Sequence, residues 1–474
     1  MVISKGKWLF ESQMRKNYDE PKYSVTFWGG VGSATGSNFL IEGENTKIMV
    51  DCGMLQGLPN SHEFNRGDFP YEPDEIDYLL VTHAHIDHIG RIPKLVKDGF
   101  RGKIYSTPET RQIAEVMLVD SAKLVDISSR EEGVLPFFTE ADVRKTMTLW
   151  SSEDYHKDVN LSDKFSFRFR DAGHILGSSI IEIERKGIRT AFTGDLGNSP
   201  TPLLRDCEYI DDADYIVMES VYGDRNHESR DERRSKLRKA VLDTVSRRGV
   251  LVIPAFSLER TQVLLYELNN LVEEDGTPPL PVFVDSPLAI KITHIYKKNR
   301  RNFNVGVQSE IEGGDDIFVF PKLSFTLTVG ESKKIQNVSS PKIIIAGSGM
   351  SEGGRVVVHE KNYISDPKNI ILLTGYQAVG TLGRKLKDGE KRVLIFNEEI
   401  TVKAEVRTIF GYSSHKDSDS LVEFVEKAGQ AGKLKRVFVV MGEPHSSLFL
   451  VQRIKDYVGT DAIVPEKGKR YDLV

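Results

Sequence analysis

The sequence predicts an α/β fold, and three observations favour it. From about Tyr23 to Asp195, short β-branched or aromatic runs end in loops rich in Gly, Asp and His. Stretches with helical periodicity lie between these runs, so strands and helices alternate along the chain. Beyond Asp214 the runs become almost continuously apolar, which is typical of parallel strands buried on both faces. We therefore expect two layered α/β parts.

Four runs in the first part predict strands that each deliver a charged or imidazole side chain at one end: "NTKIMVDCG", "IDYLLVTHAH", "FSFRFRDAGH" and "IRTAFTGDLG". The spacing in "RQIAEVMLVDSAKLVD" predicts a helix between them. Polar loops on a rigid sheet are typical of catalytic sites, so we look for function at these strand ends.

The second part contains the apolar runs "DYIVMES", "GVLVIPAF", "LPVFVDS", "KIIIAGSG" and "NIILLTGY", with a predicted helix in "ERTQVLLYELNNLVEE". These runs predict a helix-covered parallel sheet. A helix in "LVEFVEKAG" and a strand in "RVFVVMGE" then return to the first part. We expect domains at residues 1–218, 219–405 and 406–474, the last completing the first.

Composition describes an ordinary globular protein. The chain has 474 residues and a formal net charge of −5, which argues against a broadly basic nucleic-acid-coating protein but leaves room for a local cationic cleft. No run of eighteen apolar residues appears, so we expect no membrane span. Cys52 and Cys207 are too few for a disulfide framework. We expect reduced thiols and a cytoplasmic protein.

One motif carries the chemistry. In "THAHIDHIG", His83 and His85 are two residues apart, so an extended strand end turns both imidazoles to one side. Asp87 and His88 follow in the turn before a helix. Imidazole and carboxylate ligands suit zinc, with manganese or iron as alternatives. Two adjacent metal sites could be served, but further ligands must come from other strand ends, where His174 in "DAGHILGSS" and Asp195 in "TGDLG" are candidates.

These motifs, preceded by Asp51 in "VDCG", resemble the metal-binding motifs of the metallo-β-lactamase fold. The later motifs "MESVYGDR", "IPAFSLERTQ", "DSPLA", "GSGMSEGGR" and "GYQAVGTLGRKL" resemble the beta-CASP insertion of its RNA- and DNA-processing branch. The resemblance covers nearly the whole chain. It is strongest to the compact bacterial and archaeal relatives of the cleavage and polyadenylation specificity factor endonuclease, and it implies an αββα metallo-β-lactamase domain with an inserted beta-CASP domain.

The resemblance also implies roles for individual residues. One zinc would be held by His83, His85, His174 and Asp195, and a second by Asp87, His88 and the bridging Asp195. Asp51 would orient a histidine. Glu219 would pair with His415, in "SSHKDS", as a proton-delivery device.

The chain departs from the family at its last motif. In "VFVVMGEPHSS", Met441 stands where the family has a histidine that completes the second zinc. A thioether is a poor zinc ligand among carboxylates, so we expect a space-filling side chain. His445 is the candidate substitute. The second metal could therefore be weak, completed by water or absent.

Two divalent ions less the charges of two aspartates would attract a phosphodiester strongly. Such a pair would lower the pKa of a bridging water and supply a metal hydroxide as nucleophile. His415 would stabilise the phosphoryl oxygen or protonate the leaving alkoxide. Ser348, Gly349, Arg355 and Arg384 are candidates for holding a phosphate or RNA.

The leading hypothesis is a zinc-dependent ribonuclease that cleaves single-stranded RNA, with DNA as an alternative substrate. A hydrolase of small esters or thioesters, and a weakly active RNA-binding subunit with an altered second metal site, are the competing hypotheses. Endonuclease or exonuclease action and the natural target stay open. A homodimer is compatible with the family.

Overall fold

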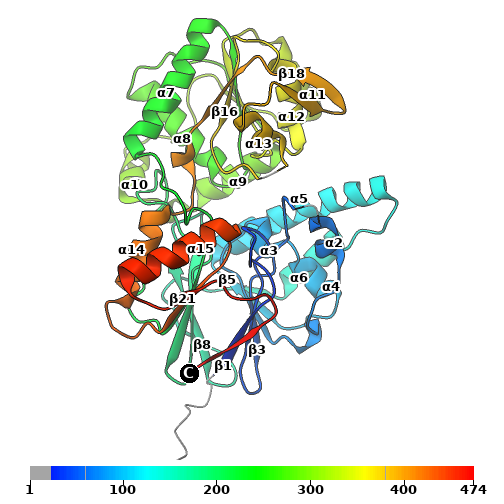
Figure 1. Ribbon diagram of the computed structural model, residues 1–474. Coiled ribbons are helices and arrows are strands. Elements are labelled where there is room, and N and C mark those ends of the chain that lie inside the picture. The colour runs from blue at the N-terminus through cyan, green and yellow to red at the C-terminus, as the bar shows by residue number, and fades with distance from the viewer. Residues whose placement is uncertain (1–22, 59, 379) are drawn as a thin grey trace, which may run out of the picture.

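The computed structural model describes residues 23–58, 60–378 and 380–474 and confirms the predicted α/β fold class. The first 22 residues of the expected first domain lie outside the described residues. Figure 1 shows a lower part built on two facing sheets and an upper part in which helices surround a third.

The lower part is a sandwich of two seven-stranded sheets. In spatial order the first contains β22 (Arg470–Leu473), β1 (Tyr23–Phe27), β2 (Phe39–Glu42), β3 (Lys47–Val50), β4 (Tyr78–Leu80), β5 (Lys103–Ser106) and β6 (Trp150–Ser152). The second contains β21 (Ala462–Ile463), β20 (Arg436–Val439), β11 (Tyr215–Met218), β10 (Ile188–Phe192), β9 (Ser179–Arg185), β8 (Phe165–Asp171) and β7 (Val159–Asn160).

The two sheets share an apolar core that includes Phe27 and Val50 of the first and Phe192 and Phe438 of the second. Strand β8 shows how the sequence builds it: its phenylalanines are buried and alternate with half-buried polar residues. Helices cover both outer faces, namely α4 (Ile92–Lys97), α5 (Pro108–Glu132) and α6 (Glu140–Thr148) on the first, and α14 (Ser418–Gly429) and α15 (Pro444–Arg453) on the second. This is the expected αββα arrangement.

The upper part holds a six-stranded sheet in which every pairing is parallel, as predicted. Its order is β14 (Leu323–Phe325), β13 (Val282–Asp285), β15 (Lys342–Ala346), β12 (Val250–Pro254), β16 (Ile370–Leu373) and β19 (Glu405–Thr408). The helices of this part are α7 (Arg230–Arg247), α8 (Arg260–Glu273), α9 (Pro287–Lys298), α10 (Val305–Glu312), α11 (Val329–Lys334), α12 (Gly354–Tyr363) and α13 (Leu382–Lys387). A hairpin of β17 (Arg392–Ile395) and β18 (Glu398–Thr401) is separate.

The chain enters the upper part after β11 and leaves it after β19, which pairs with β16 through Thr408. The last strand of the upper sheet therefore ends at Thr408. Strand β20 then pairs in parallel with β11, so the final segment lies in the lower part.

Loops at the carboxyl ends of the upper sheet contact the lower part. After β16, the hydroxyl of Tyr376 donates a hydrogen bond to Glu443. After β12, the carboxylate of Glu259 accepts from the hydroxyl of Tyr296, and the same hydroxyl accepts from the backbone N–H of Leu176 at 3.2 Å. The ligand-binding edge of a parallel sheet thus faces the sandwich.

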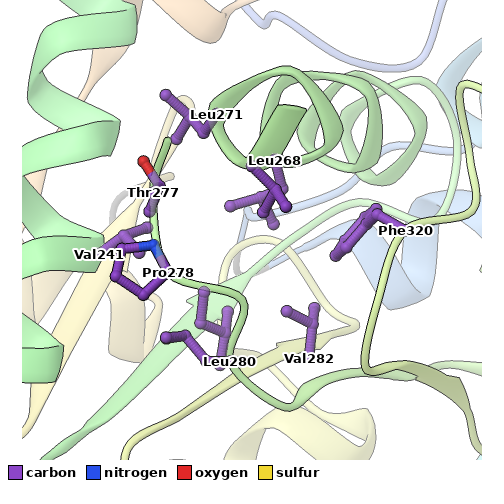
Figure 2. Close-up of a pocket in the computed structure, with 10 residues that line it drawn as sticks. Val241, Leu268, Leu271, Thr277, Pro278, Leu280, Val282 and Phe320 are labelled. Carbon is purple, nitrogen blue, oxygen red and sulfur yellow. The ribbon is translucent and has the colours of Figure 1, made fainter. Parts of the chain in front are cut away.

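Figure 2 shows a small pocket in the upper part, between α7, α8 and the start of β13. It is lined almost wholly by apolar side chains, among them Leu268, Leu280 and Phe320. It contains none of the candidate site residues. No described helix is both long enough and apolar enough to cross a membrane.

Candidate metal centre

Four strand ends converge to form the site. The motif at residues 82–88 follows β4 and continues into the short helix α3 (Ile86–Ile89), while His174 follows β8. Asp195 follows β10 and Glu219 follows β11 directly. These strands belong to both sheets, so the candidate residues gather at one edge of the sandwich.

The first predicted ligand set forms one compact cluster. His83 Nε2 and His174 Nε2 each lie 3.2 Å from His85 Nδ1, and they lie 3.3 Å and 3.5 Å from Asp195 Oδ2. A tetrahedral zinc with bonds of about 2.0–2.1 Å requires ligand atoms about 3.4 Å apart. The four atoms therefore have the separations that a tetrahedral cation requires.

The protonation of this cluster suits a metal. Burial and the neighbouring imidazoles lower the pKa values of His83, His85 and His174. Neutral imidazoles can each offer a lone pair, which protonated ones cannot. The Nδ1 atom of His83 lies 3.0 Å from the hydroxyl of Thr82, a contact that helps to orient the ring.

A second set of atoms lies against the first. His88 Nε2 is 3.4 Å from Asp195 Oδ1 and 3.8 Å from Asp87 Oδ2. Both His88 Nε2 and Asp195 Oδ1 are buried and have no hydrogen-bond partner in the described part of the chain. Buried polar atoms are nearly always paired, so this pair fits a site that takes a second cation.

Asp51 connects to this second set. Its Oδ2 atom lies 2.7 Å from His88 Nδ1 and accepts from the hydroxyls of Thr82 and Ser37, and its Oδ1 accepts from the Thr82 backbone N–H. Burial alone would lower the pKa of His88, yet the carboxylates of Asp195, Asp51 and Asp87 raise it. The carboxylates around His88 therefore give the second set excess negative charge, which a cation would offset.

Glu219 and His415 face each other beside the cluster. His415 Nδ1 lies 3.0 Å and 3.1 Å from the two oxygens of Glu219 and 3.9 Å from Asp195 Oδ2. Glu219 Oε1 also accepts from the Leu196 backbone N–H at 2.7 Å, which holds the carboxylate in place. Although burial disfavours its cation, these carboxylates raise the pKa of His415 to about 9.

Met441 lies in the core between the two sheets. It is 2 % exposed, belongs to the cluster that contains Phe27 and Phe438, and its backbone N–H donates to the carbonyl of Gly30 at 2.6 Å. It fills space there, as expected. His445 is exposed on the first turn of α15, where its ring faces Phe449. Among the described residues, the His, Cys and carboxylate groups close enough to hold a metal are His83, His85, His174 and Asp195, and Asp195, Glu219 and His415, and neither group contains His445.

The candidate phosphate-binding residues are placed differently from one another. Arg355 turns inward: its guanidinium donates to the carboxylate of Asp285 and to the carbonyls of Thr326 and Leu327. These hydrogen bonds account for the position of the Arg355 guanidinium without a ligand. Arg384 donates to Asp388 four residues along α13.

Ser348 and Gly349 lie in the loop after β15, at the carboxyl edge of the upper sheet. The hydroxyl of Ser348 accepts from the Glu352 backbone N–H, and a Cβ on Gly349 would lie 2.7 Å from the ring of Phe256. The loop is therefore packed against the neighbouring β12 loop.

Sequence reasoning missed two groups that support the cluster. The carbonyl of Ser414 lies 3.1 Å from His174 Nδ1, so a backbone oxygen orients that ring. Tyr296 and Glu259 hold Leu176, two residues after His174. The only sequence signal for Ser414 is its position next to His415, and Tyr296 gives none.

Comparison with known families agrees with this geometry. Residues 32–254 match the model of the metallo-beta-lactamase superfamily, residues 261–386 match the Beta-Casp domain, and residues 399–465 match the Zn-dependent metallo-hydrolase RNA specificity domain. The chain belongs to the metallo-beta-lactamase superfamily and carries a Beta-Casp domain. The predicted family and fold are confirmed, and the family implies a divalent metal.

Several curated relatives match over most of this chain. Ribonuclease TTHA0252 of Thermus thermophilus is 33% identical over 89% of this chain and 94% of its own. RNase aCSPSF2 of Saccharolobus solfataricus is 31% identical, with 95% and 85% covered. Transcription termination factor FttA of Methanosarcina mazei is 28% identical, with 91% and 68% covered.

A solved structure of a protein of unknown function from Enterococcus faecalis V583 matches with a TM-score of 0.54 at 12% identity, covering 95% of this chain and all of that one. It supports the fold alone.

Proposed function

We propose that this chain is a zinc-dependent phosphodiester hydrolase that cleaves single-stranded RNA. One observation carries the proposal: Asp195 shares its two oxygens between two ligand sets, and His415 lies 3.9 Å from it, held by Glu219. Relatives named as ribonucleases and the match to an RNA specificity domain favour RNA as the substrate.

The proposed first zinc site comprises His83, His85, His174 and Asp195, and the second comprises Asp87, His88 and Asp195. When bound, two divalent ions would offset the charge of a phosphodiester and lower the pKa of an attacking water. Manganese or iron is an alternative metal. We do not include His445 in either set, since it is exposed on α15.

The chain's own residues have separate tasks in this proposal. The carboxylate of Asp51 holds the His88 ring at Nδ1, so that Nε2 of His88 faces Asp195. Glu219 holds His415 in the same way, and the raised pKa keeps this imidazole protonated near neutral pH. A protonated His415 can donate a hydrogen bond to a phosphoryl oxygen or give its proton to the departing alkoxide.

We further propose the division into residues 1–218, 219–405 and 406–474, a cytoplasmic location, and RNA rather than DNA as the main substrate. The carboxyl-end loops of the upper sheet, which face the lower part, would lie along the strand. A homodimer is compatible with this arrangement, and no described feature requires one.

The proposal is tested with 5′-labelled single-stranded RNA and zinc-loaded protein. We expect cleavage that a chelator abolishes, that zinc restores and that is lost in Asp87→Ala, the control against a contaminating nuclease. A parallel panel of thioesters and lactones tests the small-molecule alternative. Chelator-sensitive hydrolysis of that panel, with every RNA left intact, would overturn the proposal.

A weakly active RNA-binding subunit is the second candidate, favoured by the buried, non-ligating position of Met441. On that hypothesis RNA binding persists without appreciable cleavage, and it survives His83→Ala. The same cleavage assay, run beside a binding assay, separates the two.

A further inference from the structure

A buried arginine of the upper part, Arg260, has side-chain N–H donors without a partner among the described residues. Arg260 is 6 % exposed, and its Nε and Nη1 atoms have no hydrogen-bond partner among the described residues. Nor does it form an ion pair within 4.0 Å of any described carboxylate. The nearby carboxylate of Glu259 accepts instead from Tyr296. A buried charge that is left unpaired is costly, so this arrangement calls for a counter-ion.

A second buried guanidinium lies near the first, and the carboxylate of Glu267 offsets part of its charge. Arg233 is 3 % exposed, and its Nε and Nη2 atoms are also without partners, while Nη1 donates to the carbonyl of Gly411. Burial lowers the pKa of Arg260 to about 10, Tyr222 and Glu259 raise it, and Arg233 lowers it further. The guanidinium keeps its charge at neutral pH. Two neighbouring cations with free donors favour an anion.

The place of Arg260 in the fold is one where ligands bind. From β12 the chain proceeds to β13, β14 and β15 on one side of the sheet, and then crosses to β16 and β19 on the other. In open α/β sheets, ligands occupy the crevice at the carboxyl ends where the order reverses. Arg260 begins α8, directly after the β12 loop, at that crevice.

Neighbouring groups connect this crevice to the metal centre. A Cβ on Gly375 would lie 3.3 Å from Arg260 Nη1, so the bare backbone after β16 runs along the guanidinium. On the other side, Tyr222 is close enough to Arg260 to raise its pKa, and the ring of Tyr222 lies 6.1 Å from that of His415. A strand that reaches the metal centre could also reach Arg260.

We propose that Arg260 binds a phosphate group of the RNA strand at the carboxyl-end crevice of the upper sheet, beside the scissile linkage. The inference rests on the proposed function, since it takes RNA as the ligand. A guanidinium offers a planar fork of N–H donors that matches phosphate oxygens. Both an internal phosphodiester and a terminal 5′-phosphate carry this chemistry.

The test measures binding rather than cleavage. Fluorescence anisotropy gives the Kd of labelled single-stranded RNA for full-length zinc-loaded Asp87→Ala protein, which serves as a cleavage-deficient background. We expect Arg260→Gln to weaken binding about ten- to a hundredfold, the range for a hydrogen-bonded charge, and Arg260→Lys to weaken it less. The matched control is Arg144→Gln, on the exposed surface of α6, which should change nothing.

Modified RNAs then locate the phosphate. A single methylphosphonate linkage neutralises one phosphate at a time. At one linkage the methylphosphonate should weaken RNA binding to the Asp87→Ala protein. The same methylphosphonate should cause no further loss of affinity when Arg260→Gln is added to that background. RNAs with a 5′-hydroxyl or a 5′-phosphate form the second arm. If the loss of affinity in Arg260→Gln depends on the 5′-phosphate, Arg260 binds the terminus of the strand. If it depends on an internal linkage, Arg260 binds the RNA backbone.

Unchanged affinity of a folded Arg260→Gln protein would overturn the inference, as would methylphosphonate effects that are equal with and without Arg260. If Arg260→Gln does not fold, the methylphosphonate series is run with Arg260→Lys instead. This variant keeps the positive charge but lacks the planar set of N–H donors of a guanidinium. Since binding is measured without cleavage, these results stand apart from the test of the proposed activity.

Discussion

The two carboxylate oxygens of Asp195 face different histidines: Oδ2 lies 3.3 Å from His83 Nε2, and Oδ1 lies 3.4 Å from His88 Nε2. Asp195 follows β10, and the two histidines follow β4, so strands of both sheets meet at this carboxylate. The arrangement suits a ligand that bridges two cations.

Asp87→Ala should bind one zinc where the unaltered protein binds two, because it removes a ligand of the second set only. Asp195→Ala should bind less than one, because both sets lose an oxygen. Zinc content after dialysis against metal-free buffer measures both. Retention of two zinc ions by Asp87→Ala would show that Asp87 is not a ligand.

His415→Ala should lower kcat about 10²- to 10⁴-fold, the range for loss of a general acid or base. Zinc content should stay the same, because His415 is outside both proposed ligand sets. The control is His156→Ala, whose side chain is 57% exposed and pairs only with Glu208. Equal losses of zinc and of activity in His415→Ala would instead make it a ligand.

Met441→His should make folding more dependent on zinc. An imidazole in the apolar cluster around Met441 costs free energy unless it finds a partner, so the metal-free variant should be less stable than the unaltered protein. Thermal unfolding with and without zinc measures the difference. We expect zinc to raise the Tm of the variant more than that of the unaltered protein. An identical rise in both proteins would place residue 441 out of reach of the metal.

Glu360→Gln should stabilise the protein at pH 7.5 and much less near pH 5. Burial raises the pKa of Glu360 to about 7, and among the described residues its carboxyl accepts a hydrogen bond only from the hydroxyl of Ser351, at 2.6 Å. A carboxyl with a raised folded-state pKa loses stability as the pH rises from the unfolded value toward 7. The variant has no charge to bury, so it should gain on the order of 2 kcal/mol at pH 7.5.

Urea unfolding of both proteins between pH 5 and pH 8 checks this prediction. The difference in unfolding free energy should grow from pH 5 to pH 7 and then level off. A difference that does not vary with pH would mean that Glu360 is ionised throughout, contrary to its burial.

The cluster of candidate metal ligands was predictable because each residue stands close to the end of a strand whose pattern is plain. Strand ends of the two facing sheets meet at one edge of the sandwich, so the rings of His83 and His174 are in contact although they lie 91 positions apart in the sequence. The parallel sheet of the upper part was predictable for a similar reason, since its strands are apolar on both faces.

Other features depend on contacts that no local pattern reports. Arg355 was a candidate phosphate ligand because it lies in a glycine-rich loop, yet its guanidinium donates to the carboxylate of Asp285, seventy positions earlier. Arg260 lies within a stretch predicted only as a helix, and its burial, at 6 % exposure, is set by tertiary packing. His445 is only four positions after Met441 in the sequence, but α15 begins at Pro444, and His445 on its first turn is exposed to solvent.

The measurement that tests the central claim most directly is zinc titration of metal-free protein, with bound zinc and RNA cleavage measured on the same samples. Two ligand sets that share Asp195 predict slow cleavage with the first equivalent and a steep rise with the second. Full activity with one equivalent, or none with two, would contradict a two-metal centre.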